Sequence, residues 1–437
     1  MNKTFRPWQV EQRWLLPPSV QEMVPVGHIA HFVRDTVREE LDLTAILSTY
    51  DEERGFPPYH PTMMTALLLY AYCQGVYSSR RIARACKERV DFMAVTAMQQ
   101  PDFRTVADFR KRHLAALAKL FLQVLRLCQR AQIVKLGHVA LDGTKLKANA
   151  SKHKAMSYGR MKETEQRLGE EVQSWFDRAS AADASEDNEH GLERSGDELP
   201  DWVVNKEKRR QKIREAMVAL EAEAAEPPDD DPKPPSGKRS KPNDAPQDAP
   251  SPKDKAQRNF TDPESKIMKT KDGFIQGYNC QAAVDGHAQV IVAHEVVAGQ
   301  NDVSRLMPML EQIQQNAGRH ADELSADAGY CSEANLASIR RRRINGYVAT
   351  GRQRRGTKPK RRRAELQGRL TRAMRRKLKR GGFRSRYRLR KQIVEPVFGQ
   401  IKDARGFRHF SLRGLANVSG EWALICTAHN LLKLAAA

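Results

Sequence analysis

Strand-forming and helix-forming segments alternate from residue 274 onward, and this order restricts the possible folds more than any other feature of the chain. Two apolar runs, FIQGYNCQAAVD and AQVIVAHEVV, flank Asp285-Gly286-His287, which is typical of a hairpin turn. The following segments indicate helix, strand, helix and strand in turn: 303–315, 323–330, 332–343 and 345–350. With the earlier strand at 137–144, this order predicts a mixed α/β sheet with flanking helices.

The segment between the first strand and the next ones has a different composition. Residues 152–225 are charged and rich in Ala and Glu, with helical stretches, whereas residues 226–258 are rich in Pro, Asp and Lys. A segment with almost no apolar side chains cannot offset the entropy lost on ordering, so we expect 226–258 to be disordered. Because the strands on both sides belong to one sheet, residues 152–258 are predicted to be an insertion within a domain spanning 137–437.

Residues 1–130 are predicted to form a separate, all-helical domain. An apolar stretch begins at Pro61 and ends at Gly75, a residue typical of the position just after a helix. Further along, Thr105 and Asp108 have the spacing of a capping box before another long helix.

A short turn containing glycine joins two of these helices, the second of which is predicted to be capped by Ser78 or Ser79. This arrangement is compatible with a helix-turn-helix, although any small helical bundle has such turns. If the domain binds DNA, three basic residues are the candidates for contact: Arg80, Arg81 and Arg84.

Positive charge is in large excess, with 75 Lys+Arg against 53 Asp+Glu, a net charge of +22. Solubility alone requires a net charge of only about 2–8 on a small domain. Residues 340–391 contain 24 Lys/Arg and a single acid, Glu365. A surplus of one sign at this density favours a polyanionic partner, because each neutralised phosphate releases counterions.

The six cysteines lie far apart and form no C-x-x-C pair, which argues against a zinc ribbon and against a disulfide framework. The N-terminal segment lacks the apolar core of a signal peptide, and the longest apolar run, 66–73, is far below the ~20 residues needed to span a bilayer. These features favour a reducing compartment, either a bacterial-type cytoplasm or a nucleus.

Three acids occur where a sheet and its neighbouring helix could bring them together. Asp142 is predicted to close the first strand and Asp327 the fourth. Glu395 lies in a helical segment in which Lys391 and Lys402 share its face, and in which Pro396 removes a backbone donor. Taken alone, Asp142 could be only a turn residue, and Glu395 could be half of an ordinary i,i+4 ion pair.

Three carboxylates beside lysines suit phosphodiester chemistry. Mg²⁺ prefers oxygen ligands, and two such ions some 3.5–4 Å apart can activate an attacking hydroxyl and stabilise a leaving oxygen. Neighbouring lysines would bind the phosphate. The sequence contains no P-loop, no H-E-x-x-H, no G-x-S-x-G and no kinase motif set, which argues against those chemistries.

Four ordered segments resemble the DDE transposases of bacterial insertion sequences: LDGTKLKANAS (141–151), TDPESKIMKTKDGFIQGYNCQAAVD (261–285), SADAGYCSEANL (325–336) and VEPVFGQIKDARGFRHFSLRGL (394–415). Residues 60–86 look like the helical N-terminal domain of those proteins. The resemblance implies a ribonuclease-H-like catalytic domain with its triad at Asp142, Asp327 and Glu395.

The resemblance has further implications for cofactor, partners and location. It implies two Mg²⁺ ions, with Mn²⁺ as a possible substitute, and double-stranded DNA partners in the form of terminal inverted repeats and target DNA. We expect a homodimer in the active complex, since two element ends must be brought together, and a cytoplasmic, nucleoid-associated protein without membrane contact.

In that family the third acid often lies in a Y-(2)-R-(3)-E-(6)-K signature. Glu395 and Lys402 fit its second half, whereas Lys391 occupies the arginine position, with Arg390 adjacent. Tyr387 falls one residue away from the expected tyrosine. Lysine does not replace the planar arginine fork fully, so the identity of the phosphate-binding side chains is left open.

Two other functions compete with transposition. A plain nuclease of the same fold would cut DNA without joining it, and a catalytically silent DNA-binding repressor derived from a transposase would be expected to have lost an acid. All three acids are present here.

Overall fold

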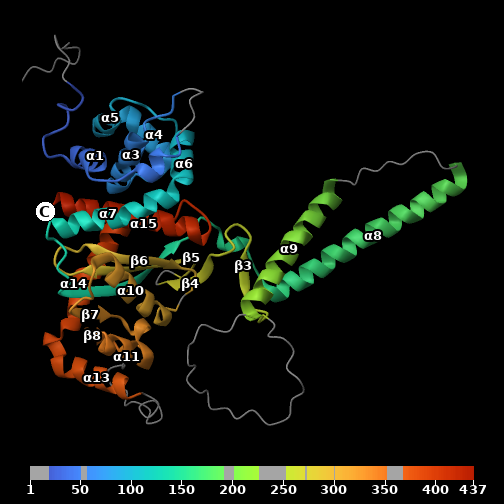
Figure 1. Cartoon of the computed structure of the whole chain (residues 1–437). Helices are drawn as coiled ribbons and strands as arrows, with labels where there is room; N and C mark the ends of the chain where they lie inside the picture. Colours follow the sequence, from blue (N-terminus) through green and yellow to red (C-terminus); the bar gives the residue numbers. More distant parts are fainter. Residues whose placement is uncertain are drawn as a thin grey trace, which may run out of the picture. The chain divides into compact units, whose positions relative to one another are not determined.

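The computed structural model describes residues 19–50, 57–190, 201–225, 252–270, 273–299, 301–351 and 368–437. It divides the chain into two compact units (Figure 1), one formed by Met1–Val124 with Thr427–Ala437 and the other by Leu125–Cys426. The end of the last helix thus belongs to the N-terminal unit, whereas we expected it in the catalytic domain. Within the described ranges, no helix is long and apolar enough to cross a membrane.

The N-terminal unit is built from helices, as predicted. Its central helix, α3 (Pro61–Cys73), is buried almost all round, and Gly75 follows it with a φ of +70°, a conformation that glycine adopts most easily. The predicted start and end of this helix are therefore confirmed. The other helices of the unit are α1 (Ile29–Glu39), α2 (Thr44–Leu47), α4 (Ser79–Glu88), α5 (Val90–Thr96) and α6 (Phe103–Arg112), followed by α7 (Leu114–Arg130).

Two local predictions for this unit are wrong. The helical spacing of Ile82, Cys86 and Val90 predicts one helix after Ser78, but this helix breaks at Arg89, whose extended backbone separates α4 from α5. The capping box at Thr105 does not form, because α6 begins earlier and Asp102 caps it by accepting the N–H of Arg104 at 2.8 Å.

The second unit contains a six-stranded sheet in the order β4-β5-β1-β7-β8, with β6 also paired to β5. One edge of the long strand β5 pairs first with β4 and then with β6, while its other edge pairs with β1. The strands are β1 (His138–Lys147), β4 (Lys266–Thr270), β5 (Gly273–Asp285), β6 (Ile291–Val297), β7 (Glu323–Ala326) and β8 (Asn345–Val348).

Strand direction makes this a ribonuclease-H-like sheet, as predicted. β1, β5 and β6 are antiparallel neighbours, whereas β7 and β8 run parallel to β1. The predicted hairpin between β5 and β6 is confirmed. Helices α10 (Leu306–Ala317) and α11 (Glu333–Arg341) connect β6 to β7 and β7 to β8, which confirms the alternation of helix and strand.

Helix α14 (Leu389–Gly399) packs across β1, β5 and β7. The helical spacing of Ile393, Val397 and Ile401 predicts an apolar side that packs on the sheet, and all three residues are buried. Beyond α14 the chain continues into a π-helical turn, η6 (Gln400–Ala404). The described residues also include α13 (Arg369–Gly381) before α14 and α15 (Leu415–Ala435) after it.

Pro396 lies inside α14 and cannot donate a hydrogen bond to the carbonyl four residues earlier. That carbonyl belongs to Gln392 and accepts instead from the side chain of Gln289, at 3.0 Å. The helix therefore tolerates its proline because the loop between β5 and β6 supplies the missing donor.

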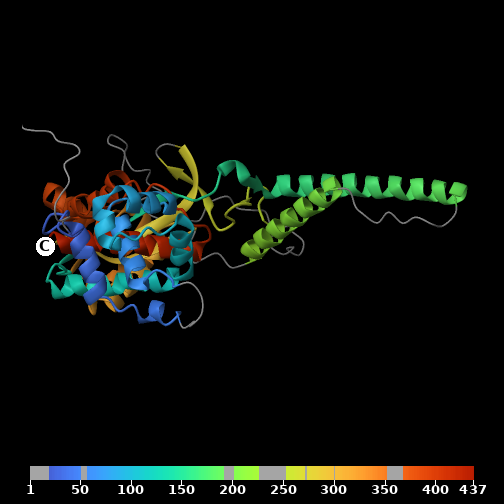
Figure 2. The same cartoon turned by 90° about the horizontal axis from the view of Figure 1, so that it is seen from above.

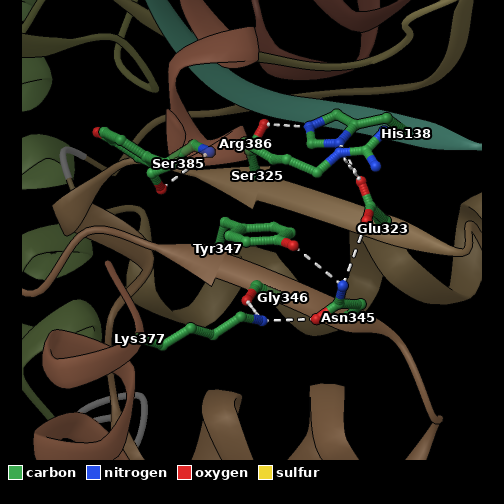
Figure 3. A network of polar contacts seen from close by, with 10 residues as sticks. His138, Glu323, Ser325, Asn345, Gly346, Tyr347, Lys377, Ser385 and Arg386 are labelled. Atoms are coloured by element: carbon green, nitrogen blue, oxygen red, sulfur yellow. Dashed lines mark hydrogen bonds and ion pairs between the residues drawn. The ribbon is translucent and has the colours of Figure 1, made fainter. Parts of the chain in front are cut away.

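A polar network joins the first residues of the three parallel strands, as Figure 3 shows. His138 Nδ1 lies 3.0 Å from Glu323 Oε2, and the Asn345 amide donates to the same carboxylate at 3.2 Å. Arg386, just before α14, forms an ion pair with Glu323 at 2.7 Å. The network therefore fixes the start of α14 against the amino ends of β1, β7 and β8.

The insertion contains a folded helical pair, α8 (Tyr158–His190) and α9 (Asp201–Ala225), visible in Figure 2. Its small core consists of Tyr158, Met161, Leu168, Ile213, Ala216 and Leu220. Strands β2 (Ala155–Ser157) and β3 (Gln257–Asn259) pair antiparallel where the insertion meets the sheet domain.

The disorder predicted for 226–258 falls largely on residues 226–251, which lie outside the described residues. From Pro252 the chain is described, and β3 already begins at Gln257. The prediction of disorder is therefore wrong for 252–258, where pairing of β3 with β2 orders the last residues.

Candidate active site

The parallel pairing of β1 with β7 places two of the candidate acids side by side. The register ends at Leu141 opposite Ala326, so the next residues of the two strands are Asp142 and Asp327. β7 stops there, as predicted, but β1 does not: it continues to Lys147 because its other edge remains paired with β5. Asp142 is thus a mid-strand residue at the point where its parallel neighbour ends.

Both aspartates sit in surroundings that disfavour their charge. The Asp142 side chain is only 17% exposed, and burial raises its pKa to about 6 even though Arg390 beside it acts in the opposite direction. Burial also raises the pKa of Asp327, opposed by the Gly329 N–H, which donates to its carboxylate at 2.7 Å. The pair therefore has less compensating positive charge than two ionised carboxylates require.

A third carboxylate, Asp302, reaches the same place from the loop after β6. Its position just before the helical segment 303–315 predicts a capping role, but its side chain makes no capping hydrogen bond. Its Oδ1 instead accepts from the amides of Asn279 at 2.7 Å and Gln281 at 2.8 Å. Its negative charge raises the pKa values of both Asp142 and Asp327, though less than burial does.

The sequence contains a pattern from which a polar partner such as Asp302 could have been predicted. Asn279 and Gln281 are two apart on β5 and so point to the same face of the sheet. Buried amides in an otherwise apolar strand need polar partners. Gln281 has two of them, since it also accepts from the hydroxyl of Tyr330, three residues beyond Asp327.

Two glycines keep the space between these side chains open. A Cβ on Gly329 would lie 2.9 Å from Asp302 Oδ2 and 2.9 Å from Asp327 Oδ1. A Cβ on Gly143 would lie 2.6 Å from Gln281 Nε2 and 3.2 Å from Asp302 Oδ1. The carboxylates of Asp302 and Asp327 therefore border a small space that any side chain larger than that of glycine would fill.

Glu395 is connected to the aspartates through Arg390. The guanidinium of Arg390 forms an ion pair with Asp142, and its second nitrogen lies 3.4 Å from Glu395 Oε1. The Arg390 side chain is 13% exposed, whereas that of Glu395 is 48% exposed. The structure thus brings Asp142 and Asp327 together and links Glu395 to them by a positive group.

The basic residues expected beside Glu395 are arranged differently from the prediction. Lys391 is exposed, and Arg390 rather than Lys391 lies beside the acids. The guanidinium of Arg390 also lies over the ring of Tyr387, 6.0 Å from its centroid. The Y-(2)-R part of the signature is therefore intact as Tyr387 and Arg390, with one additional residue before the glutamate.

Lys402 lies on the π-helical turn rather than on a continuing α-helix, and its ammonium donates to Thr144 Oγ1 at 2.6 Å. Thr144 is two residues beyond Asp142 on β1 and therefore shares its face of the sheet. Burial lowers the pKa of Lys402. This lysine thus lies beside Thr144, on the same face of β1 as Asp142.

The donor set fits divalent cations, although Arg390 now contacts two of the acids. Among the described residues, no group of three or more His, Cys, Asp or Glu side chains is arranged around a metal position. Carboxylate oxygens are nevertheless the ligands that Mg²⁺ prefers, and the negative charges of Asp142, Asp327 and Asp302 act on one another at close range. Withdrawal of the Arg390 guanidinium would free Asp142 and Glu395 for a metal.

The candidate DNA contacts in the N-terminal unit are exposed on α4: Arg80, Arg81 and Arg84. Arg84 forms an exposed i,i+4 ion pair with Glu88 at 2.8 Å, and Arg80 lies over the Phe103 ring. Their exposure is compatible with binding a partner, as is that of Lys87 on the same helix.

Two parts of the chain match known protein families. Residues 247–431 match the family described as Transposase DDE domain, and residues 18–112 match the family described as Transposase domain (DUF772). The first range includes Asp302, Asp327 and Glu395 but begins within the insertion, so it leaves out β1 and Asp142. No curated protein matches the chain, and no solved structure does.

Proposed function

Since its two matched domains make this chain a DDE transposase, we propose that it binds the terminal inverted repeats of an insertion sequence, cleaves DNA at its ends and joins the 3′-hydroxyls to target DNA. The observation that carries the proposal is the register of β1 and β7, which juxtaposes Asp142 and Asp327 beneath the helix that bears Glu395.

The side chains of the site have two proposed roles: some bind the cation and others bind the phosphate. Asp142, Asp327 and Glu395 are the proposed metal ligands. Asp302, which accepts hydrogen bonds from the amides of Asn279 and Gln281, adds a further negative charge. Bound Mg²⁺ would supply activation of the attacking oxygen and stabilisation of the leaving oxygen.

Positive side chains around the acids would bind the DNA. Arg390, once released from Asp142 and Glu395, offers its planar fork to a phosphate, and Lys402 adds a point charge beside Thr144. Lys391 and Tyr387 lie on the same helical segment, near enough in sequence to contact the flanking backbone. The partial burial of Arg390 and Lys402 strengthens their interactions relative to water.

The decisive experiment compares the wild type with Asp327→Asn on DNA carrying the element ends. The amide keeps the shape of the side chain but removes its charge, so end cleavage and strand transfer should both fall by about a hundredfold or more. Full activity of this variant would refute the site. Binding of the end DNA should persist, which separates lost chemistry from lost folding.

A second substrate separates the competing functions. Pre-cut ends with a free 3′-hydroxyl should be joined to target DNA by a transposase, whereas a plain nuclease would leave them unjoined. A silent repressor would bind the ends but neither cut nor join them, and would show no Mg²⁺ uptake in calorimetry with DNA bound.

A further inference from the structure

A cavity of about 480 Å³ lies where the insertion meets the sheet domain, formed by three separate parts of the chain. The segment around β2 and the start of α8 forms one wall, α9 forms another, and Phe260 follows β3. Its basic lining consists of His153, Lys154, Arg160, Arg209 and Lys212. The remaining lining residues are apolar: Ala155, Met156, Ile213 and Phe260.

Four cationic side chains and, among the described residues, no acid line the cavity, which makes it strongly positive. Lys154, Arg160, Arg209 and Lys212 are all exposed. The ion pairs recorded between the described helices of the insertion use other basic residues, with Glu165 bound to Arg210 and Arg214, and Glu171 bound to Lys206. The charge that faces the cavity is therefore available to a partner.

The backbone around the cavity is fixed without a ligand. The Phe260 N–H donates to the Lys154 carbonyl at 3.1 Å, and the Asn259 amide donates to the Ser151 carbonyl at 2.8 Å. Ile213, which forms part of the lining, is also part of the hydrophobic core between α8 and α9. A partner would thus meet a preformed site, which reduces the entropy lost on binding.

We propose that this cavity binds backbone phosphates of the element's DNA, so that the insertion acts as a second DNA-holding site apart from the acids. Cationic side chains next to apolar ones suit the chemistry of nucleic acid, in which charged phosphates alternate with less polar sugars and bases. This inference rests on the proposed function for the identity of the DNA. It assigns the insertion a contact that carries no base specificity.

The test compares two double variants of the full-length protein, each of which removes two positive charges from the insertion. Arg160→Ala with Lys212→Ala alters the cavity, whereas Lys208→Ala with Lys253→Ala removes exposed lysines that do not line it. Binding of a fluorescent duplex carrying the terminal repeat is measured by anisotropy at several salt concentrations. A scrambled duplex of equal length is measured in parallel.

The cavity variant should bind both duplexes more weakly, and the slope of log affinity against log salt should become shallower by about 1 for each phosphate that is no longer neutralised. The control variant should keep the wild-type slope. Arg160→Lys with Lys212→Arg should restore binding, because the charges return. Equal behaviour of the two double-alanine variants would overturn the proposal, and would leave an acidic protein segment as the better occupant.

Catalytic measurements keep this inference separate from the proposed function. Strand transfer at saturating DNA should be unchanged in the cavity variant, because its acids are intact. If the wild type neither cleaves nor joins DNA, the proposed function fails. The phosphate site is still supported in that case if the cavity variant loses salt-dependent DNA binding and the control variant does not. Thermal unfolding of both variants verifies that weaker binding does not come from impaired folding.

Discussion

The charge balance around Asp142 is the central feature at the scale of single residues. Burial raises its pKa to about 6, Asp302 adds a further negative charge, and Arg390 supplies the compensating positive group. A metal ion would replace that guanidinium, since both interact with the same carboxylates. Metal binding and movement of Arg390 should therefore be coupled.

Gly329→Ala tests whether the open space beside Asp302 and Asp327 is functional. The added methyl group would lie 2.9 Å from an oxygen of each, so both carboxylates must move. Because a displacement of about 1 Å can reduce catalysis a hundredfold, we expect a large loss of Mg²⁺-dependent cleavage with nearly unchanged folding. Gly137→Ala is the matched control, since nothing lies within 4 Å of its Cβ.

Cleavage assays and thermal unfolding on these two variants give the answer. Comparable cleavage by Gly329→Ala and Gly137→Ala would show that the acids do not need this geometry. A large drop in melting temperature for Gly329→Ala alone would instead indicate a structural role for the glycine.

Arg390→Ala and Lys391→Ala test which basic residue acts beside the acids. Removing Arg390 leaves the buried Asp142 without its ion-pair partner, which should destabilise the metal-free protein by about 1–3 kcal/mol. Strand transfer should also fall, because the phosphate-binding fork is removed. Lys391→Ala, at an exposed position, should change stability by less than about 0.5 kcal/mol.

Urea unfolding without metal and strand-transfer rates with Mg²⁺ measure the two effects. If Lys391→Ala were the more damaging variant in both assays, the arrangement of the helix relative to the acids would be different from the one described.

At the scale of elements, α14 determines which side chains meet the acids. Its start is fixed to the sheet through Arg386 and Glu323, and its proline is compensated by Gln289. The π-helical turn that follows changes the helical phase before Lys402. Such turns are frequent at functional sites because they redirect one side chain without ending the helix.

Strand β6 contributes an acid-sensitive residue, His294, whose backbone N–H donates to Gln312 on α10 at 2.7 Å. Burial lowers the pKa of His294 to about 4. In the unfolded chain a histidine titrates near ~6.5, so between about pH 6.5 and 4 the unfolded state binds more protons. The stability that depends on neutral His294 is therefore fully present above about pH 6.5 and is lost as the pH falls towards 4.

His294→Gln should therefore reduce the loss of stability between pH 7 and pH 4.5, by about 1–2 kcal/mol relative to the wild type. Urea unfolding at the two pH values in metal-free buffer measures this difference. His287→Gln, at an exposed turn position, serves as the control. An identical pH dependence of His294→Gln and wild type would contradict the prediction.

At the scale of the whole molecule, one chain contains one set of the proposed catalytic acids, and an element has two ends. Two chains should therefore assemble around two end duplexes in the active complex. Mixing duplexes of two lengths should produce, on native gels, a complex that contains one of each. Complexes that never contain both lengths, together with full strand transfer, would contradict a paired assembly.

Much of the architecture follows from the sequence alone. The alternation after residue 274 predicted the mixed sheet, because period-two apolar patterns and turn residues are local signals. The position of Asp327 after an apolar run predicted a strand end correctly. The helical pattern of α14 likewise predicted the buried side that carries Ile393 and Val397.

Only the tertiary structure decided the site itself. Asp302 meets Asn279 and Asp327 through pairing of distant segments, and β1 continues past Asp142 because β5 remains at its other edge. Whether Arg390 or Lys391 faces the acids depends on how α14 docks on the sheet. The sequence by itself determined which elements form and which acids follow them. Long-range pairing decided which side chains meet, because strand register and helix docking are set by contacts far apart in the chain.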